Sequence, residues 1–168
     1  EAGGISPMTD KVRTADEDNP KGYYEFERVK QMDKGDVAWV PEARRKVVKV
    51  ISALLKYLPS SEQYRGIFIR RNMAEILASQ RKMLVNRGED PDKQDDAQMA
   101  MLFEKHLAQV ETWLADQPNI RTLYVQYSNV LDDPRSAIDE INSFLGNTLN
   151  VEDMAVVVDP SLYRNREM

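Results

Sequence analysis

The 168-residue chain contains no cysteine, which excludes disulfides, thiolate metal sites and a cysteine nucleophile. It also lacks any apolar run near the roughly 20 residues needed to cross a bilayer, and it has no signal-peptide pattern. Basic residues are outnumbered by acidic ones, 23 to 28, for a net charge of −5. A general nucleic-acid binder would carry a basic surface, whereas a small anionic ligand needs only local positive charge. We therefore expect a cytoplasmic protein with no membrane span and no nucleic-acid partner.

The composition, with 42% hydrophobic and 30% charged residues, is typical of a soluble globular domain with a real core. We predict a single domain over residues 1–168. The chain opens with Glu1-Ala2-Gly3-Gly4-Ile5 and no initiator Met. A glycine pair before an apolar residue is typical of a helix end, so we expect an N-terminally truncated domain whose preceding helix has been lost.

Short β-rich runs alternate with helix-like segments along the chain. Strands are predicted at 46–51, 64–70 and 121–127, and helices at 52–58, 72–85, 97–115, 134–146 and 151–157. Ser52 is a plausible cap for the first of these helices. This alternation favours an α/β fold with a parallel sheet and right-handed crossovers. Ligands of such sheets bind at the carboxyl ends of the strands.

One strand end carries two consecutive cations, Arg70 and Arg71. Asn72 follows as a helix cap, and Glu75, three residues on, completes a capping-box pattern. A cation beside the free N–H groups of a helix N-terminus is well placed to hold an anion. Ser79 shares a helix face with Glu75 and offers a hydroxyl on that side. The stretch therefore predicts a phosphate site.

Two other features have plainer interpretations. The aromatic residues Tyr23, Tyr24 and Phe26 follow an Asn-Pro-Lys-Gly turn signal, and we interpret their rings as anchors of that loop rather than as substrate contacts. The only histidine, His106, lies beside the apolar stripe of the 97–115 helix. Nothing near it in the sequence pairs with it as a metal ligand or triad member, so we interpret it as a packing or surface residue.

Three segments together resemble the sulfotransferases that use 3′-phosphoadenosine 5′-phosphosulfate. Residues 69–79 resemble the family's strand-helix segment, in which an Arg and a Ser eight positions later hold the 3′-phosphate; Arg71 and Ser79 have that spacing. Residues 123–134 and 141–146 look like its late strand, Asp-Pro helix start and Phe-Leu-Gly helix end. Residues 16–25 are similar to a loop of bacterial sulfotransferase-like proteins. The resemblance covers nearly the whole chain.

The resemblance implies a three-layer, P-loop NTPase-like parallel sheet with flanking helices, here without its central first strand. It implies 3′-phosphoadenosine 5′-phosphosulfate as cofactor, bound by Arg71 and Ser79, and no metal. The intact parent would transfer a sulfuryl group to a hydroxyl or amine of a small-molecule, glycan or lipid acceptor.

Two departures from the family pattern affect activity. The chain has no glycine-rich phosphate loop to cradle the 5′-phosphosulfate, so we expect these 168 residues alone to be poor or inactive as an enzyme. Many members also place a catalytic His after the strand predicted here at 46–51. This chain has Ser52 there, with Lys49 close by, and we interpret both as structural. Other members use a Glu of the early loop, for which Glu25 and Glu27 are candidates, and no catalytic residue is assigned.

Two alternatives stay open. One is a catalytically inactive interaction module on the same fold, which the missing loop and unassigned base favour. The other is a small-molecule kinase-like P-loop protein, which would need an acidic Mg²⁺ partner at a strand end. No Asp immediately follows any predicted strand, which counts against a kinase.

Overall fold

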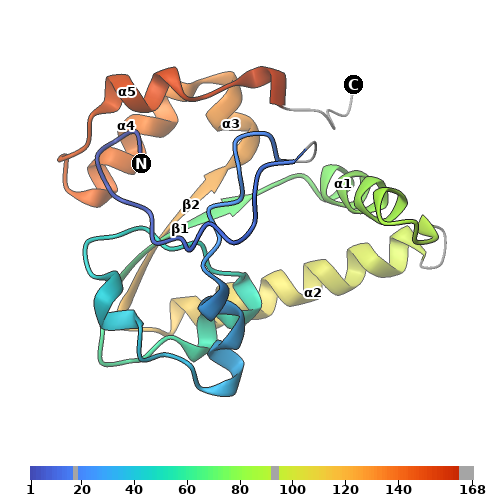
Figure 1. The fold of residues 1–168 in the computed structure, drawn as a ribbon, viewed down its shortest axis with the longest axis horizontal. Coiled ribbons are helices and arrows are strands. Elements are labelled where there is room, and N and C mark those ends of the chain that lie inside the picture. Colours follow the sequence, from blue (N-terminus) through green and yellow to red (C-terminus); the bar gives the residue numbers. More distant parts are fainter. Residues whose placement is uncertain (17–18, 92–94, 163–168) are drawn as a thin grey trace.

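The computed structural model describes residues 1–16, 19–91 and 95–162. Two parallel strands lie at the centre of the chain, and Figure 1 shows α1 and α2 on one side of them and α3, α4 and α5 gathered on the other. The strands are β1 (Tyr64–Arg70) and β2 (Ile120–Gln126). The α-helices are α1 (Met73–Asn86), α2 (Asp96–Ala115), α3 (Tyr127–Asp132), α4 (Pro134–Leu145) and α5 (Val151–Val156). Short 3-10 helices are η1 (Glu27–Lys34), η2 (Val40–Ala43), η3 (Ser52–Tyr57) and η5 (Pro160–Leu162).

The sheet confirms the α/β class and the parallel pairing but not every predicted strand. β1 and β2 pair in register from Tyr64 opposite Ile120 to Arg70 opposite Gln126, so their carboxyl ends meet at one edge. The predicted strand at 46–51 is wrong, because that segment forms only a parallel bridge between Pro7 and Val47. Val48 and Val50 are partly buried against a hydrophobic cluster, while Val47 and Ile51 remain exposed. Among the described residues the segment therefore has a packing face but no partner strand. The three-layer arrangement stays a prediction.

The tightest packing lies outside the sheet, in the segment before β1. Val29, Met32, Trp39 and Val40 form a buried cluster, and only 1% of the surface of Met32 and Trp39 is exposed. The ring of Phe26 meets the Trp39 indole edge-on, with centroids 5.3 Å apart. The indole Nε1–H donates to the carbonyl of Asp36 over 3.0 Å, so burying this polar group leaves no donor unpaired. This cluster holds η1 and η2 together beneath the early loop.

Turn and cap residues place the helices close to where the sequence predicts them. Asp133 caps α4, with Pro134 at its first position, and Gly146 ends it in the left-handed conformation (φ 103°). Gly4, of the N-terminal glycine pair, also has a left-handed conformation (φ 97°). The chain beyond β2 differs from the prediction, since α3 begins at Tyr127, directly after the strand. Within the described ranges, no helix has the length and apolarity to cross a membrane.

Candidate functional site

The two arginines at the end of β1 have different surroundings. Arg70 is the last residue of the strand; its guanidinium pairs with Glu111 on α2, with Nη2 2.7 Å from the carboxylate, and lies 4.3 Å above the Tyr124 ring. These contacts fasten α2 to the carboxyl end of β1. The guanidinium of Arg70 is thus engaged in contacts within the protein. Of the two arginines, Arg71 is therefore the better candidate to bind an anion at the end of β1.

Arg71 is held on two sides while one of its donors stays unused. Its Nη2 lies 3.7 Å from the carboxylate of Glu75, and its guanidinium lies 4.8 Å from the centre of the Tyr127 ring. Its side chain is 31% exposed. Its Nε is buried and has no hydrogen-bond partner among the described residues. A buried donor without a partner costs free energy, so this atom marks a place where an acceptor group fits.

The start of α1 provides the rest of the predicted phosphate site. The Asn72 side chain accepts a hydrogen bond from the backbone N–H of Ala74, as an N-cap does. The carboxylate of Glu75 lies 3.7 Å from Nη2 of Arg71, and its side chain is only 7% exposed. Ser79 lies one helical turn after Glu75 on the same face and is half-buried. Arg71 thus lies between β1 and α1, directly before the cap of α1, and the buried carboxylate of Glu75 offsets part of its positive charge. No contact between Arg71 and Ser79 is seen among the described residues, so their joint role stays a prediction.

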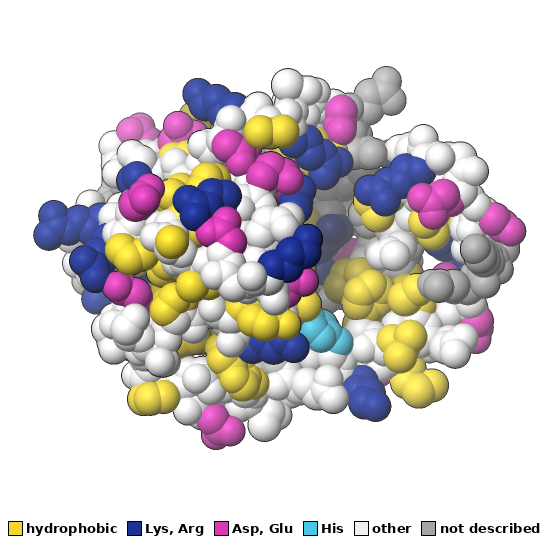
Figure 2. All heavy atoms as spheres, turned by 60° about the horizontal axis from the view of Figure 1, so that its bottom comes forward, with side chains coloured by type: hydrophobic (Ala, Val, Ile, Leu, Met, Phe, Trp, Pro, Cys, Tyr) yellow, Lys and Arg dark blue, Asp and Glu magenta, His cyan; other side chains and the backbone are white. Residues whose placement is uncertain are grey.

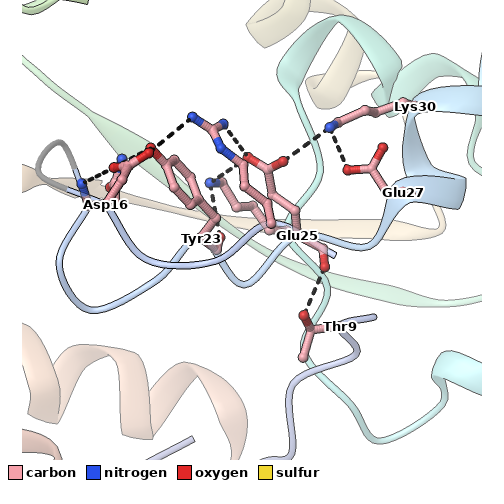
Figure 3. Close-up of polar contacts among 9 residues, drawn as sticks. Thr9, Asp16, Tyr23, Glu25, Glu27 and Lys30 are labelled. Atoms are coloured by element: carbon pink, nitrogen blue, oxygen red, sulfur yellow. Dashed lines mark hydrogen bonds and ion pairs between the residues drawn. The ribbon is translucent and has the colours of Figure 1, made fainter. Parts of the chain in front are cut away.

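The early loop gathers charges around one carboxylate. Figure 3 shows Glu25 beside Lys30, whose Nζ is 3.1 Å from it; Arg13 and Lys49 each lie 3.6 Å away. Burial raises the pKa of Glu25, but contact with Lys30 and the charges of Lys30, Lys49 and Arg13 outweigh it, so the pKa falls below its ordinary value. A carboxylate with a lowered pKa is a weaker base. Glu25 is therefore better suited to hold the loop together than to take a proton.

The remaining contacts of this loop show that Tyr23 anchors it, whereas Tyr24 is 48% exposed and does not. Tyr23 is buried, and its hydroxyl donates to the Asp16 carboxylate over 2.6 Å (Figure 3). This hydrogen bond is the main reason that the pKa of Tyr23 is raised. The Arg13 guanidinium lies 3.3 Å from the centre of the same ring. Glu27, the other candidate base, accepts a 2.6 Å hydrogen bond from Lys30, so both candidate carboxylates are ion-paired.

The structure also pairs two residues that the sequence predictions kept apart. Ser52 does not cap η3, because the cap position is Ile51. The Oγ of Ser52 instead lies 2.9 Å from Nε2 of His106 on α2. This hydrogen bond gives His106 a partner that the sequence did not indicate, and the interpretation of His106 as a packing or surface residue stays a prediction. Fifty-four residues separate the two, and no local pattern reveals such a contact. The only hint in the sequence that Ser52 has such a role is its position directly after the 46–51 segment.

Comparisons with known proteins give one match. The family model described as "Sulfotransferase domain" matches residues 19–166, which include both strands, Arg71, and Glu25 and Glu27 of the early loop. Searches of curated proteins and of solved structures find no match. Because the family model covers most of the chain, it shows the family, and sulfuryl transfer is the general activity that the assignment supports. The chain belongs to the sulfotransferase domain family.

Proposed function

We propose that this domain binds 3′-phosphoadenosine 5′-phosphosulfate through Arg71 and Ser79 and serves sulfuryl transfer to an acceptor hydroxyl or amine. One observation carries the proposal: at the carboxyl end of β1, Arg71 keeps a buried Nε–H without a partner among the described residues. A phosphate oxygen is a strong acceptor for such a donor. The charge, the donor and the helix start at Asn72 together suit a phosphate group.

Each residue has a distinct part in this proposal. Arg71 attracts the 3′-phosphate and directs a hydrogen bond to it, while the Tyr127 ring and the Glu75 carboxylate keep its guanidinium in place. Ser79 donates its hydroxyl from the next turn of α1. The bound donor supplies the activated sulfuryl group, whose transfer is an in-line displacement like that of a phosphoryl group. A cytoplasmic location, and a small-molecule, glycan or lipid acceptor, belong to the same proposal.

The catalytically inactive module is the second candidate, and the Glu75 contact favours it. A buried carboxylate 3.7 Å from Arg71 satisfies part of the arginine charge without any ligand. If Arg71 and Glu75 have only a structural role, their ion pair stabilises the fold and Arg71 does not bind nucleotide. The two candidates therefore differ in whether Arg71 contributes to nucleotide affinity.

Calorimetric titration with 3′-phosphoadenosine 5′-phosphate separates them. We expect Arg71→Ala to weaken binding by at least about tenfold, since a hydrogen bond to a charged group contributes about 1.5–3 kcal/mol. Ser79→Ala should weaken it less, because it removes a neutral donor. Arg65→Ala, at the opposite end of the same strand, is the matched control and should bind like wild type. Equal affinity of wild type and Arg71→Ala would remove the proposal.

A further inference from the structure

The outward face of α2 carries a shallow groove. Among the described residues, side chains of this one helix line it: Lys105, Ala108, Gln109, Thr112, Trp113 and Asp116. These positions recur at spacings of three and four residues, so they share one face of the helix. Leu114, which α2 buries in the interior, lies on the opposite side of the helix. The groove therefore faces away from the rest of the domain.

This face is unusually apolar for a helix surface in contact with water. Met101 precedes Lys105 by four residues and is 65% exposed, and Leu102 precedes it by three and is 57% exposed, so both lie on the groove side. Figure 2, in which the underside of Figure 1 comes forward, shows hydrophobic side chains in yellow exposed beside the histidine of α2, in cyan. An amphipathic helix usually turns polar side chains to solvent. Apolar side chains grouped at a surface instead mark an interaction site.

The chain also exposes more surface than its mass predicts. A compact protein of 19.3 kDa is expected to expose about 8,500 Å², whereas this chain exposes 11,101 Å². The difference, roughly 2,600 Å², exceeds the area of about 800 Å² that each partner buries in an interface of standard size. The fold therefore has enough uncovered surface for a stable interface, and the outward face of α2 provides exposed apolar side chains for it.

Opposite charges at the two ends of the groove indicate which partner fits it. Lys105 lies at one end and Asp116 at the other, about 16 Å apart along the helix axis. Within the described ranges neither side chain forms an ion pair. When a second α2 crosses the groove antiparallel, with its centre over Ala108 and Thr112, the Lys105 of each copy meets the Asp116 of the other. A two-fold axis repeats this contact, so the face is complementary to itself.

We propose that the outward face of α2 is the interface of a symmetric homodimer, in which the α2 helices of two copies pack antiparallel. Ala108 and Thr112 lie at the centre, where their small side chains let the helices approach closely. Two ion pairs between Lys105 and Asp116 fix the direction and register of the contact. None of these residues belongs to the proposed nucleotide site, so the dimer and the proposed function stand or fall separately.

Sedimentation velocity of the protein expressed from its full reading frame tests the interface. We expect wild type to dimerise at concentrations up to about 100 µM, since interfaces of standard size have micromolar or tighter affinity. Ala108→Arg and Thr112→Arg should each raise the Kd of the dimer at least about tenfold, because a long charged side chain then occupies the centre. Ser143→Arg, at an exposed position of α4, is the matched control and should dimerise like wild type.

Thermal unfolding of each variant shows whether it is folded, and two positions at the centre give two chances of a folded variant. A monomeric wild type over this concentration range would overturn the proposal. So would a folded Ala108→Arg or Thr112→Arg that dimerises with wild-type affinity, since the interface would then lie elsewhere.

Charge exchange tests the antiparallel arrangement. Lys105→Glu alone, and Asp116→Lys alone, each place two pairs of like charges in the dimer and should raise its Kd by about threefold or more at low salt. The double variant Lys105→Glu/Asp116→Lys restores opposite charges across the contact and should recover the affinity of wild type. A double variant as weak as the single ones, or single variants that dimerise like wild type, would overturn the pairing of Lys105 with Asp116.

Discussion

Replacement of Glu25 by Gln tests whether the early loop depends on its cluster of charges. The substitution keeps the shape of the side chain and removes its charge, while Arg13, Lys30 and Lys49 remain around it. These three cations are 41–56% exposed and Glu25 itself is 19% exposed. Because solvent screens these contacts, each ion pair should contribute only about 0.2–1 kcal/mol to the free energy of unfolding, and the three together about 1–2 kcal/mol. Thermal unfolding should detect a loss of about 2–8 °C in Tm for a domain of this size.

The stability difference between wild type and Glu25→Gln should depend on pH. Because the pKa of Glu25 in the folded protein lies below its ordinary value of 4.5, the carboxylate adds stability at pH values above that ordinary pKa. The contribution is lost as pH falls through the folded-state pKa. We therefore expect wild type to be more stable than Glu25→Gln at pH 7, and the two to converge in acid.

Glu27→Gln is the matched control for this comparison. Glu27 is more exposed than Glu25, and within the described ranges it forms an ion pair with Lys30 alone, so its replacement should change Tm little at either pH. Equal Tm values of wild type and Glu25→Gln at pH 7 would refute the view that Glu25 organises the loop. So would a difference that persists unchanged in acid.

Two further substitutions test the packing around Trp39 and the separate roles of Arg70 and Arg71 at the end of β1. Trp39→Ala should destabilise the domain by about 3–5 kcal/mol, because it empties a fully buried site and leaves the Asp36 carbonyl without its indole donor; urea unfolding measures this, and a loss below about 1 kcal/mol would place the main core elsewhere. Arg70→Ala should cost about 1 kcal/mol through its contacts with Glu111 and Tyr124. Its affinity for 3′-phosphoadenosine 5′-phosphate should stay near that of wild type, and a loss as large as that of Arg71→Ala would contradict the assignment of separate roles.

Local signals in the sequence predicted much of the fold. The buried run before Arg70, the Asn72 cap, the Asp133-Pro134 helix start and the Gly146 helix end depend on residues close together in the chain. The strand expected at 46–51 failed for a reason that lies elsewhere in the structure. β-propensity reports how a side chain packs, and Val48 and Val50 do pack against the cluster around Trp39. Among the described residues, however, only the bridge to Pro7 pairs with the backbone of this segment.

In the candidate site, too, local features could be predicted from the sequence and contacts between distant segments could not. The spacing of Arg71 and Ser79 can be seen in the sequence because the two residues lie eight positions apart, one just before the cap of α1 and the other within that helix. The pairing of Arg71 with Tyr127, and of Ser52 with His106, joins segments far apart in the chain. No periodic pattern encodes such contacts, because they depend on how helices and strands pack.

The most direct test of the central claim is a thermodynamic cycle at Arg71. It compares 3′-phosphoadenosine 5′-phosphate with adenosine 5′-phosphate, two ligands that differ only in the 3′-phosphate, in wild type and in Arg71→Ala. If Arg71 holds the 3′-phosphate, removing both should cost much less than the sum of the two single losses. We predict that wild type distinguishes the ligands by at least about tenfold and that Arg71→Ala largely loses this distinction. Strictly additive losses would show that Arg71 does not contact the 3′-phosphate and would contradict the account.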